Sequence, residues 1–161
     1  MAVVLARIDN RLIHGQILEA WVPYVKADCI VVANDRIASA ALEKTLMAAA
    51  VPKGIRVVID SLQQVAQILA EDDLAGARVL LLFESTNDAL AARRAGVPYE
   101  DLNLGNMHAG EGKCRYSCTI SLDPEDIDNL QLIEDQGVTI ASQCIPADRE
   151  RPWRKLVGAV G

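Results

Sequence analysis

Short apolar runs alternate with longer amphipathic segments along the whole chain. Five of the runs are continuous and rich in β-branched residues, which is typical of strands buried on both faces of a parallel sheet. These predicted strands are residues 2–8, 29–33, 55–59, 77–83 and 137–142. The segments between them predict helices at residues 14–25, 37–50, 61–71, 86–95 and 123–136.

Two of the predicted helices carry clear start signals. Segment 61–71 begins at Ser61, a good N-cap residue, and its apolar residues recur with helical spacing. Segment 123–136 begins with Asp123 at the N-cap and Pro124 at the first helical position, and it ends before a glycine. Strands that alternate with such helices predict an open α/β sheet covered on both faces by right-handed crossovers.

The stretch from residue 99 to residue 122 has a different pattern. Two short extended pieces, residues 101–104 and 115–120, lie on either side of a Gly-rich loop without a helix. We expect them to add to the sheet late and in an antiparallel way. No repeat or linker divides the chain, so the prediction is one α/β domain over residues 1–161, with an open, mainly parallel sheet, helices on both faces and an antiparallel strand or hairpin late in the chain.

Composition narrows the function classes. The chain has 161 residues, of which 51% are hydrophobic, enough for one core built mainly from Val, Ile, Leu and Ala because only 4% are aromatic. Its net charge is −6 and it has no Lys/Arg run, which argues against a nucleic-acid partner. No stretch approaches the roughly 18 apolar residues of a membrane span, and the N-terminus does not have the order of a signal peptide. We expect a cytoplasmic protein without direct membrane insertion.

The cysteines give no sign of a metal site or of a cofactor. The four cysteines are Cys29, Cys114, Cys118 and Cys144, and no two of them form a CxxC pair. The spacing of Cys114 and Cys118, without a second pair, is a weak zinc signature. In a reducing compartment we expect free thiols, no metal and no cofactor.

Polar residues follow each predicted strand. Because ligands of an open α/β sheet gather beyond the carboxyl ends of the strands, these residues are the candidates for chemistry. They are Asp9, Asn10, Arg11 and His14, then Asn34, Asp35 and Arg36, then Asp60 and Ser61, then Glu84, Ser85, Thr86 and Asn87, and finally Gly105, Asn106 and His108.

His14 lies where the first strand ends and the next helix begins, in the segment RIDNRLIHGQ. An ordinary imidazole has a pKa near ~6.5, so at pH 7 it is largely neutral and has a lone pair that can attack phosphorus. A phosphoryl group there needs donors, which the Arg11 guanidinium and the free N–H groups of a helix start would supply. Gly15 would let the backbone approach closely. The alternative is a histidine that only hydrogen-bonds a neighbouring turn.

Other candidates have structural explanations of equal or greater weight. Arg7 fits a surface ion pair with Asp9, and His108 fits a structural loop position. Ser85 and Thr86 would cap the helix that starts there without any ligand.

At this point the residues resemble a known family. The run RIDNRLIHGQILEAWV (7–22) closely resembles the opening motif of the IIB components of the mannose/fructose/sorbose class of bacterial sugar phosphotransferase systems. The later segments IVVANDRIA, EKTLMAAAVPKGI, LLFESTNDA and LNLGNMHAGEGK resemble successive parts of the same family. The similarity covers roughly residues 3–140.

The resemblance implies a phosphocarrier, a protein-histidine–sugar phosphotransferase. A IIA partner would pass a phosphoryl group to His14, and His14 would pass it to a sugar presented by the membrane subunits IIC and IID. Residue by residue, the resemblance makes Arg11 the phosphate-binding and charge-stabilising group, and Asp9 the residue that holds the loop or its arginine in place. It makes the loop with Ser85 and Thr86 a source of hydroxyl and backbone donors.

The same site implies docking surfaces. We expect Leu12 and Met107 to be exposed apolar residues on the rim that meets IIA, with His108 beside them; ordinary loop packing is the alternative. The sugar, the phosphorylated ring nitrogen and the oligomeric state, a homo-oligomer included, stay open. So does the role of the tail around Trp153.

Three other functions stay open as well. The first is a regulatory protein in which phosphorylation of His14 signals and does not drive transport. The second is a metal-dependent aspartyl-phosphate receiver that uses Asp9, Asp35 or Asp60, although the last two are equally good turn and capping residues. The third is a small-ligand binding domain without chemistry.

Overall fold

The computed structural model describes residues 1–158 and contains one central sheet of seven strands in the order β3-β2-β4-β1-β5-β8-β9. All neighbours pair in parallel except β8 and β9, and a separate antiparallel hairpin joins β6 and β7. The strands are β1 (Ala2–Asp9), β2 (Cys29–Ala33), β3 (Arg56–Asp60), β4 (Arg78–Phe83), β5 (Asp101–Asn106), β6 (Cys114–Arg115), β7 (Ser121–Leu122), β8 (Thr139–Ser142) and β9 (Arg151–Pro152).

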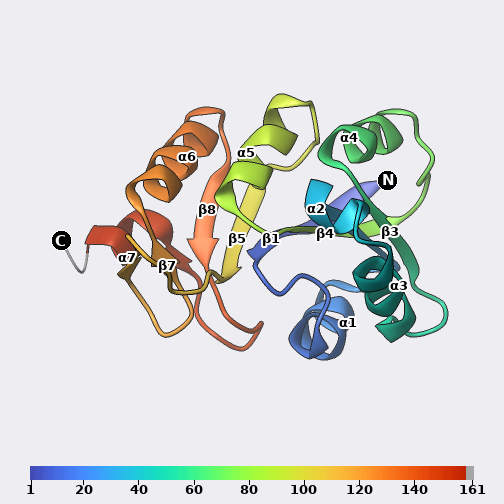
Figure 1. Cartoon of the computed structure of the whole chain (residues 1–161), viewed down its shortest axis with the longest axis horizontal. Coiled ribbons are helices and arrows are strands. Elements are labelled where there is room, and N and C mark those ends of the chain that lie inside the picture. Colours follow the sequence, from blue (N-terminus) through green and yellow to red (C-terminus); the bar gives the residue numbers. More distant parts are fainter. Residues whose placement is uncertain (159–161) are drawn as a thin grey trace.

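Helices cover both faces of this sheet, as predicted. Figure 1 shows α4, α5 and α6 on one side of the strands and α1 and α3 on the other. The helical elements are η1 (Ile17–Trp21), α1 (Val22–Val25), α2 (Asp35–Ala38), α3 (Ala41–Ala50), α4 (Leu62–Ala70), α5 (Thr86–Arg94), α6 (Pro124–Asp135) and α7 (Trp153–Gly158). The predicted single-domain α/β fold with a mainly parallel sheet is confirmed.

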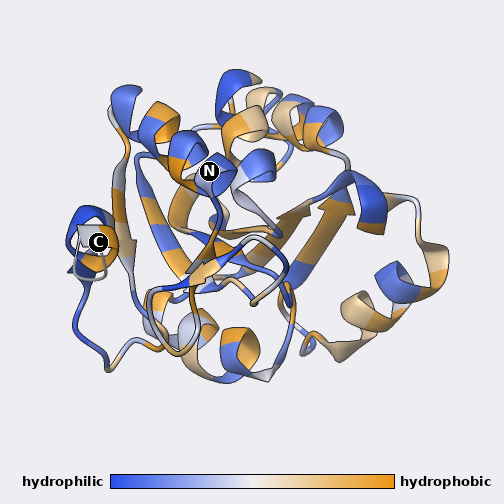
Figure 2. Ribbon diagram, turned by 60° about the vertical axis from the view of Figure 1, so that its left-hand side comes forward, coloured by the Kyte–Doolittle hydropathy of each residue, from blue (hydrophilic) through white to orange (hydrophobic). Residues whose placement is uncertain are grey.

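Two apolar cores lie on the two faces. Alternate residues of β1 point in opposite directions, so Ala6 and Ile8 pack under α4, α5 and α6, while Arg7 points to the face that carries η1 and α1. Figure 2 shows hydrophobic residues (orange) along the central strands, whereas the helices alternate between hydrophobic and hydrophilic positions. Helices α4, α5 and α6 therefore bury one face each and leave the other to solvent, whereas α3 has no buried residue.

Strand β1 occupies the position that matters most for a ligand site. It lies between β4 and β5, with Ile8 opposite Phe83 on one side and Leu104 on the other. After β1, the chain first builds β2, β3 and β4 on one side of this strand. It then continues to β5 on the other side of β1. The carboxyl end of β1 thus opens into the middle of the sheet edge, where ligands of such folds gather.

The expected antiparallel addition at residues 101–104 is wrong. That segment belongs to β5, which pairs in parallel with both β1 and β8. The antiparallel strand late in the chain is β9, on the far side of β8. Local patterns misled here because Asn103 and Gly105 interrupt the apolar run of a buried strand.

One predicted helix also differs from the structure. The expected helix at 37–50 is two helices, α2 and α3, which meet at Ala40 with φ −99° and ψ 83°, outside the helical region. The predicted N-caps Ser61, Ser85 and Asp123 are confirmed, since each side chain accepts a hydrogen bond from a backbone N–H three residues later. The described part of the tail forms β9 and α7, and the Trp153 side chain is buried in the core.

Candidate active site

A tight turn follows β1 and carries the chain to His14. Asp9 O accepts a hydrogen bond from Leu12 N at 2.9 Å, and Asp9 Oδ1 accepts one from Arg11 N at 3.0 Å. Leu12 adopts the left-handed conformation, with φ 58°, and its side chain is only 1% exposed. A buried anchor at a strained backbone position fixes the path of this turn.

The helix after the turn begins next to His14. Residues 15–25 are helical, and the first backbone hydrogen bond runs from Leu18 N to His14 O, at 3.1 Å. The preceding N–H groups of residues 15–17 therefore have no helical acceptor, as at any helix start. The middle of the helix, η1, is π-helical, a feature that recurs at functional sites.

His14 is oriented by Asp9. Its Nε2 lies 3.0 Å from Asp9 Oδ2, and its side chain is 8% exposed while that of Asp9 is fully buried. Asp9 Oδ2 also accepts hydrogen bonds from Asn106 Nδ2 at 2.9 Å and from Arg7 Nε at 3.3 Å. Burial alone would raise the pKa of Asp9, but the hydrogen bonds from His14 and Asn106 outweigh it and hold the pKa below its ordinary value. Asp9 is therefore a carboxylate at neutral pH.

This arrangement sets the two ring nitrogens apart. An anionic oxygen accepts hydrogen bonds only, so the Asp9 carboxylate favours the hydrogen of a neutral His14 ring on Nε2. Nδ1 then keeps its lone pair, and no hydrogen bond to Nδ1 is found within residues 1–158. One ring nitrogen of His14 is thus hydrogen-bonded to Asp9, and the other keeps a free lone pair.

The same turn carries a cationic side chain that is unpaired among residues 1–158. Arg11 is exposed, and its guanidinium forms no ion pair or hydrogen bond with any part of the chain that the structure describes. Gly15 is exposed too, and a β-carbon built there would have no atom within 4 Å. Arg11 is thus free to meet an anion bound at the start of the helix.

Residues 3–160 match the family model described as "PTS system sorbose subfamily IIB component". The chain belongs to this family of IIB components. PTS denotes the phosphotransferase system, and IIB components act as phosphotransferases in the phosphorylation of sugars during uptake. The family suggested by the opening motif is therefore confirmed.

Relatives and solved structures agree with the family model. The chain is 33% identical over 157 residues to the fructose-specific EIIB component of Bacillus subtilis, covering 98% of this chain and 96% of the relative. It is 28% identical to the mannose-specific EIIAB component of Escherichia coli, covering 99% of this chain and 50% of that longer protein. The crystal structure of the IIBSor domain of the sorbose permease from Klebsiella pneumoniae superposes with a TM-score of 0.94 at 30% identity, covering 100% and 99% of the two chains.

Two residues that we expected on the exposed docking rim of this IIB component are buried. Leu12 and Met107 are 1% and 5% exposed, so the expectation of exposed apolar rim residues is wrong. Leu12 packs under the turn, and Met107 joins the core on the opposite face of the sheet. His108 alone of the three is exposed.

The two hydroxyl candidates after β4 also differ. Thr86 is fully buried, donates to Asp126 Oδ1 at 2.7 Å and accepts from Asn129 Nδ2 at 3.0 Å, so its hydroxyl is used inside the fold and is not exposed to a ligand. Ser85 caps α5 and lines a cavity of about 300 Å³ that Asn10 also lines. The structure thus keeps Ser85 at the edge that carries the site and removes Thr86 from it.

Arg7 was missed as a site residue. The expected surface ion pair with Asp9 is half right: the pair exists, but Arg7 is fully buried behind the active-site turn. Its contacts with Asn103 and Cys144 lie 96 and 137 residues away in sequence, so no local pattern predicts them. Gln16 was also missed; it accepts from Asn106 Nδ2 at 3.2 Å.

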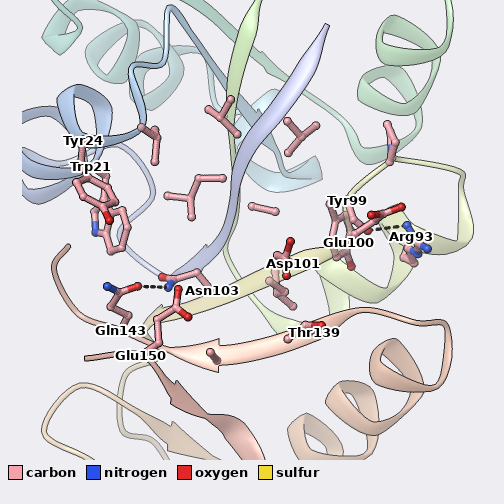
Figure 3. Close-up of a pocket in the computed structure, with 18 residues that line it drawn as sticks. Trp21, Tyr24, Arg93, Tyr99, Glu100, Asp101, Asn103, Thr139, Gln143 and Glu150 are labelled. Carbon is pink, nitrogen blue, oxygen red and sulfur yellow. Dashed lines mark hydrogen bonds between the residues drawn. The ribbon is translucent and has the colours of Figure 1, made fainter. Parts of the chain in front are cut away.

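A groove of about 560 Å³ lies on the sheet face behind Arg7. Figure 3 shows Trp21 and Tyr24 on one side of the groove. Asn103, on β5, and Gln143, directly after β8, also line it. Asn103 Nδ2 donates to Gln143 Oε1 at 3.4 Å. Three of the lining residues, Trp21, Asn103 and Gln143, also contact Arg7.

The remaining expectations concern metals, thiols and the membrane. Within residues 1–158, no group of three or more His, Cys, Asp or Glu side chains is placed to hold a metal ion. The four cysteines are free, with Cys114 and Cys118 exposed. No helix among the described residues is both long and apolar enough to span a bilayer.

Proposed function

We propose that this IIB component is a cytoplasmic histidine phosphocarrier in which His14 accepts a phosphoryl group from a IIA histidine and passes it to a sugar during uptake through IIC and IID. The observation that carries the proposal is the hydrogen bond between His14 Nε2 and Asp9 Oδ2, at 3.0 Å, which leaves Nδ1 as the nucleophile. A buried carboxylate that orients an imidazole at a sheet edge is an arrangement suited to covalent chemistry on the ring.

Phosphoryl transfer to His14 needs no proton movement. The Nδ1 lone pair attacks phosphorus, the P–N bond to the IIA histidine breaks, and its electron pair returns to that ring. Charge on the transferred oxygens is met by the Arg11 guanidinium and by the N–H groups of residues 15–17. Because such transition states are loose and metaphosphate-like, positioning and charge stabilisation are the main tasks of the protein.

In the transfer to the sugar, phosphorylated His14 is the donor and a sugar hydroxyl is the nucleophile. A sugar hydroxyl attacks phosphorus, the bond to Nδ1 breaks, and its electron pair returns to the His14 ring. The hydroxyl proton passes to a base on the subunit that holds the sugar. Asp9 remains a carboxylate throughout, because its hydrogen bonds with His14 and Asn106 are present in the resting protein.

The partners follow from the relatives. One relative is named a mannose-specific EIIAB component and has about twice the length matched by this chain, which supports a IIA unit as the donor. Such a donor must bring its histidine to the exposed surface around Arg11 and Gly15. We expect His108, exposed at the same sheet edge, to lie on the rim of that interface.

The experiment that tests the proposal follows labelled phosphate from phosphoenolpyruvate through enzyme I, HPr and a IIA protein. The wild-type protein is expected to carry an acid-labile, alkali-stable label, and His14→Gln to carry none. His108→Gln is the matched control, because it removes the other histidine of the chain. A fourfold variant with serine at each cysteine position should keep the label, which separates histidine from cysteine as the acceptor.

Three outcomes would contradict the proposal. Label that survives in His14→Gln would assign the acceptor to another residue. Label that is lost in hydroxylamine would point to an aspartyl phosphate. Label on His14 without any sugar phosphate, when IIC and IID are supplied, would favour a regulatory role in place of transport.

A further inference from the structure

The Arg7 guanidinium is buried beside the active site with every donor used. A guanidinium has five N–H groups, and each of those in Arg7 has its own acceptor. Nε donates to Asp9 Oδ2 at 3.3 Å, and Nη1 donates to Asn103 Oδ1 and to Gln143 O, the latter at 2.7 Å. Nη2 donates to Cys144 O at 3.0 Å and to Gln16 Oε1 at 3.4 Å.

The Arg7 guanidinium is also packed against Trp21 and Gly105. Its central carbon lies 4.9 Å from the ring centroid of Trp21, whose Nε1 donates to Cys144 O at 3.2 Å. A β-carbon built on Gly105 would overlap the guanidinium group, so β5 has no side chain at that point. The guanidinium is therefore held in one position by β1, β5, η1 and the segment after β8.

Asp9 is the only charged group among these contacts. The other four acceptors are two carbonyl oxygens of the backbone and two side-chain amides, which are neutral. Burying a guanidinium costs free energy that a neutral side chain of similar size would avoid. A charge at this place thus has its main electrostatic effect on Asp9, and through Asp9 on His14.

We propose that Arg7 is a positioning residue that determines which ring nitrogen of His14 receives the phosphoryl group. Arg7 holds the Asp9 carboxylate in place with Oδ2 directed at Nε2, so the ring hydrogen stays on Nε2 and the lone pair on Nδ1. The inference deepens the proposed function and rests on it for its chemical consequence. The position of the ring hydrogen, however, is a property of the unphosphorylated protein.

Loss of Arg7 has a specific consequence for the ring. Asp9 would lose its only permanently charged contact, the bond from Arg7 Nε to Oδ2, and the carboxylate would be free to turn away from Nε2. Without a carboxylate fixed opposite Nε2, the ring hydrogen is no longer confined to Nε2, and part of the protein would carry it on Nδ1. In that form the lone pair lies on Nε2, on the Asp9 side of the ring and away from any donor protein.

Proton-detected nitrogen NMR of protein labelled with ¹⁵N-histidine measures this directly at a pH where the ring is neutral. The wild-type protein is expected to show the Nε2–H form of His14, and Arg7→Met and Arg7→Gln a loss of that form. Arg7→Gln is the milder change, because it keeps a polar side chain with two donors. Arg7→Lys restores the charge and should restore part of the Nε2–H form. Arg11→Gln, which neutralises the exposed arginine of the same turn, should leave the tautomer unchanged.

A merely structural Arg7 would behave differently. It would lower the melting temperature of each folded variant and leave the Nε2–H form intact, and that result in either Arg7→Met or Arg7→Gln overturns the inference. After phosphorylation, wild type should carry phosphate on Nδ1 only, whereas Arg7→Gln should lose about 10–100-fold in rate and carry part of its label on Nε2. If wild type accepts no phosphate at all, the proposed function fails while the tautomer measurement still decides the role of Arg7.

Discussion

The Arg7 guanidinium occupies the space where a side chain of Gly105 would lie, so the close contact of β1 and β5 at the active site depends on a residue without a β-carbon. Gly105 does not have a positive φ, and its backbone conformation is therefore open to other residues. Space alone requires glycine here. Because Gly105 has no side chain, the buried Arg7 guanidinium has room beside β5 and can contact Asp9.

Gly105→Ala is expected to lower the free energy of unfolding by about 1–3 kcal/mol, because the added methyl group must displace either the strand or the guanidinium. Urea denaturation of the two proteins measures the difference. Gly110→Ala is the control, since the nearest atom to its built β-carbon is 3.8 Å away. Equal stability of Gly105→Ala and wild type would show that Arg7 adjusts its position without cost.

Asp9→Asn is expected to reduce phosphoryl acceptance by His14 by about 10²- to 10⁴-fold, because an amide can donate to Nε2 and so place the ring hydrogen on Nδ1. The rate of label transfer from a saturating IIA donor measures the change. Asp128→Asn, an exposed change on α6, provides the matched control. A rate within twofold of wild type in Asp9→Asn would remove Asp9 from the mechanism.

The strands and helix starts were predictable because their signals are local. A strand buried on both faces needs a continuous apolar run, and Ser61 and Asp123 cap their helices through bonds to N–H groups three residues away. The parallel placement of β5 was not predictable, since its partners β1 and β8 lie far away in sequence. Polar Asn103 within that strand contacts Arg7, and it interrupts the continuous apolar run that is typical of a parallel strand buried on both faces.

The candidate site also has one part that local sequence predicts and one part that only the fold brings together. Asp9, Arg11 and His14 lie within one turn of chain, so their proximity followed from sequence. The residues that fix Arg7 come from β5 and from the segment after β8, and only the fold brings them together. Burial is also a property of the whole fold, which explains why Leu12 and Thr86 were misplaced.

Thr86→Val is expected to lower the free energy of unfolding by about 1–3 kcal/mol, because it leaves the buried partners Asp126 and Asn129 without the hydroxyl. The rate of phosphoryl transfer to His14 should stay unchanged, since the Thr86 hydroxyl does not reach the site. Thr45→Val, which removes an exposed hydroxyl on α3, serves as the control for stability. A slower transfer in folded Thr86→Val would restore Thr86 as a phosphate donor.

Asp88→Asn is expected to raise the free energy of unfolding at pH 7. Burial, together with the nearby Glu84 and Asp35 carboxylates, raises the pKa of Asp88 above its ordinary value of 3.8, although Asn34 donates a hydrogen bond that opposes the shift. The folded protein therefore disfavours ionised Asp88 more than the unfolded chain does. This cost is absent below pH 3.8 and reaches its full size once the pH exceeds the pKa of the folded state.

The gain from Asp88→Asn should consequently shrink as the pH falls and disappear at acidic pH. Asparagine can still accept the hydrogen bond from Asn34 Nδ2, now 2.8 Å from the carboxylate, so the cavity edge keeps its geometry. Urea denaturation from pH 7 down to pH 4 measures the trend, with Asp128→Asn on exposed α6 as the reference. A stability difference that does not change with pH would mean that Asp88 acts through packing and not through its charge.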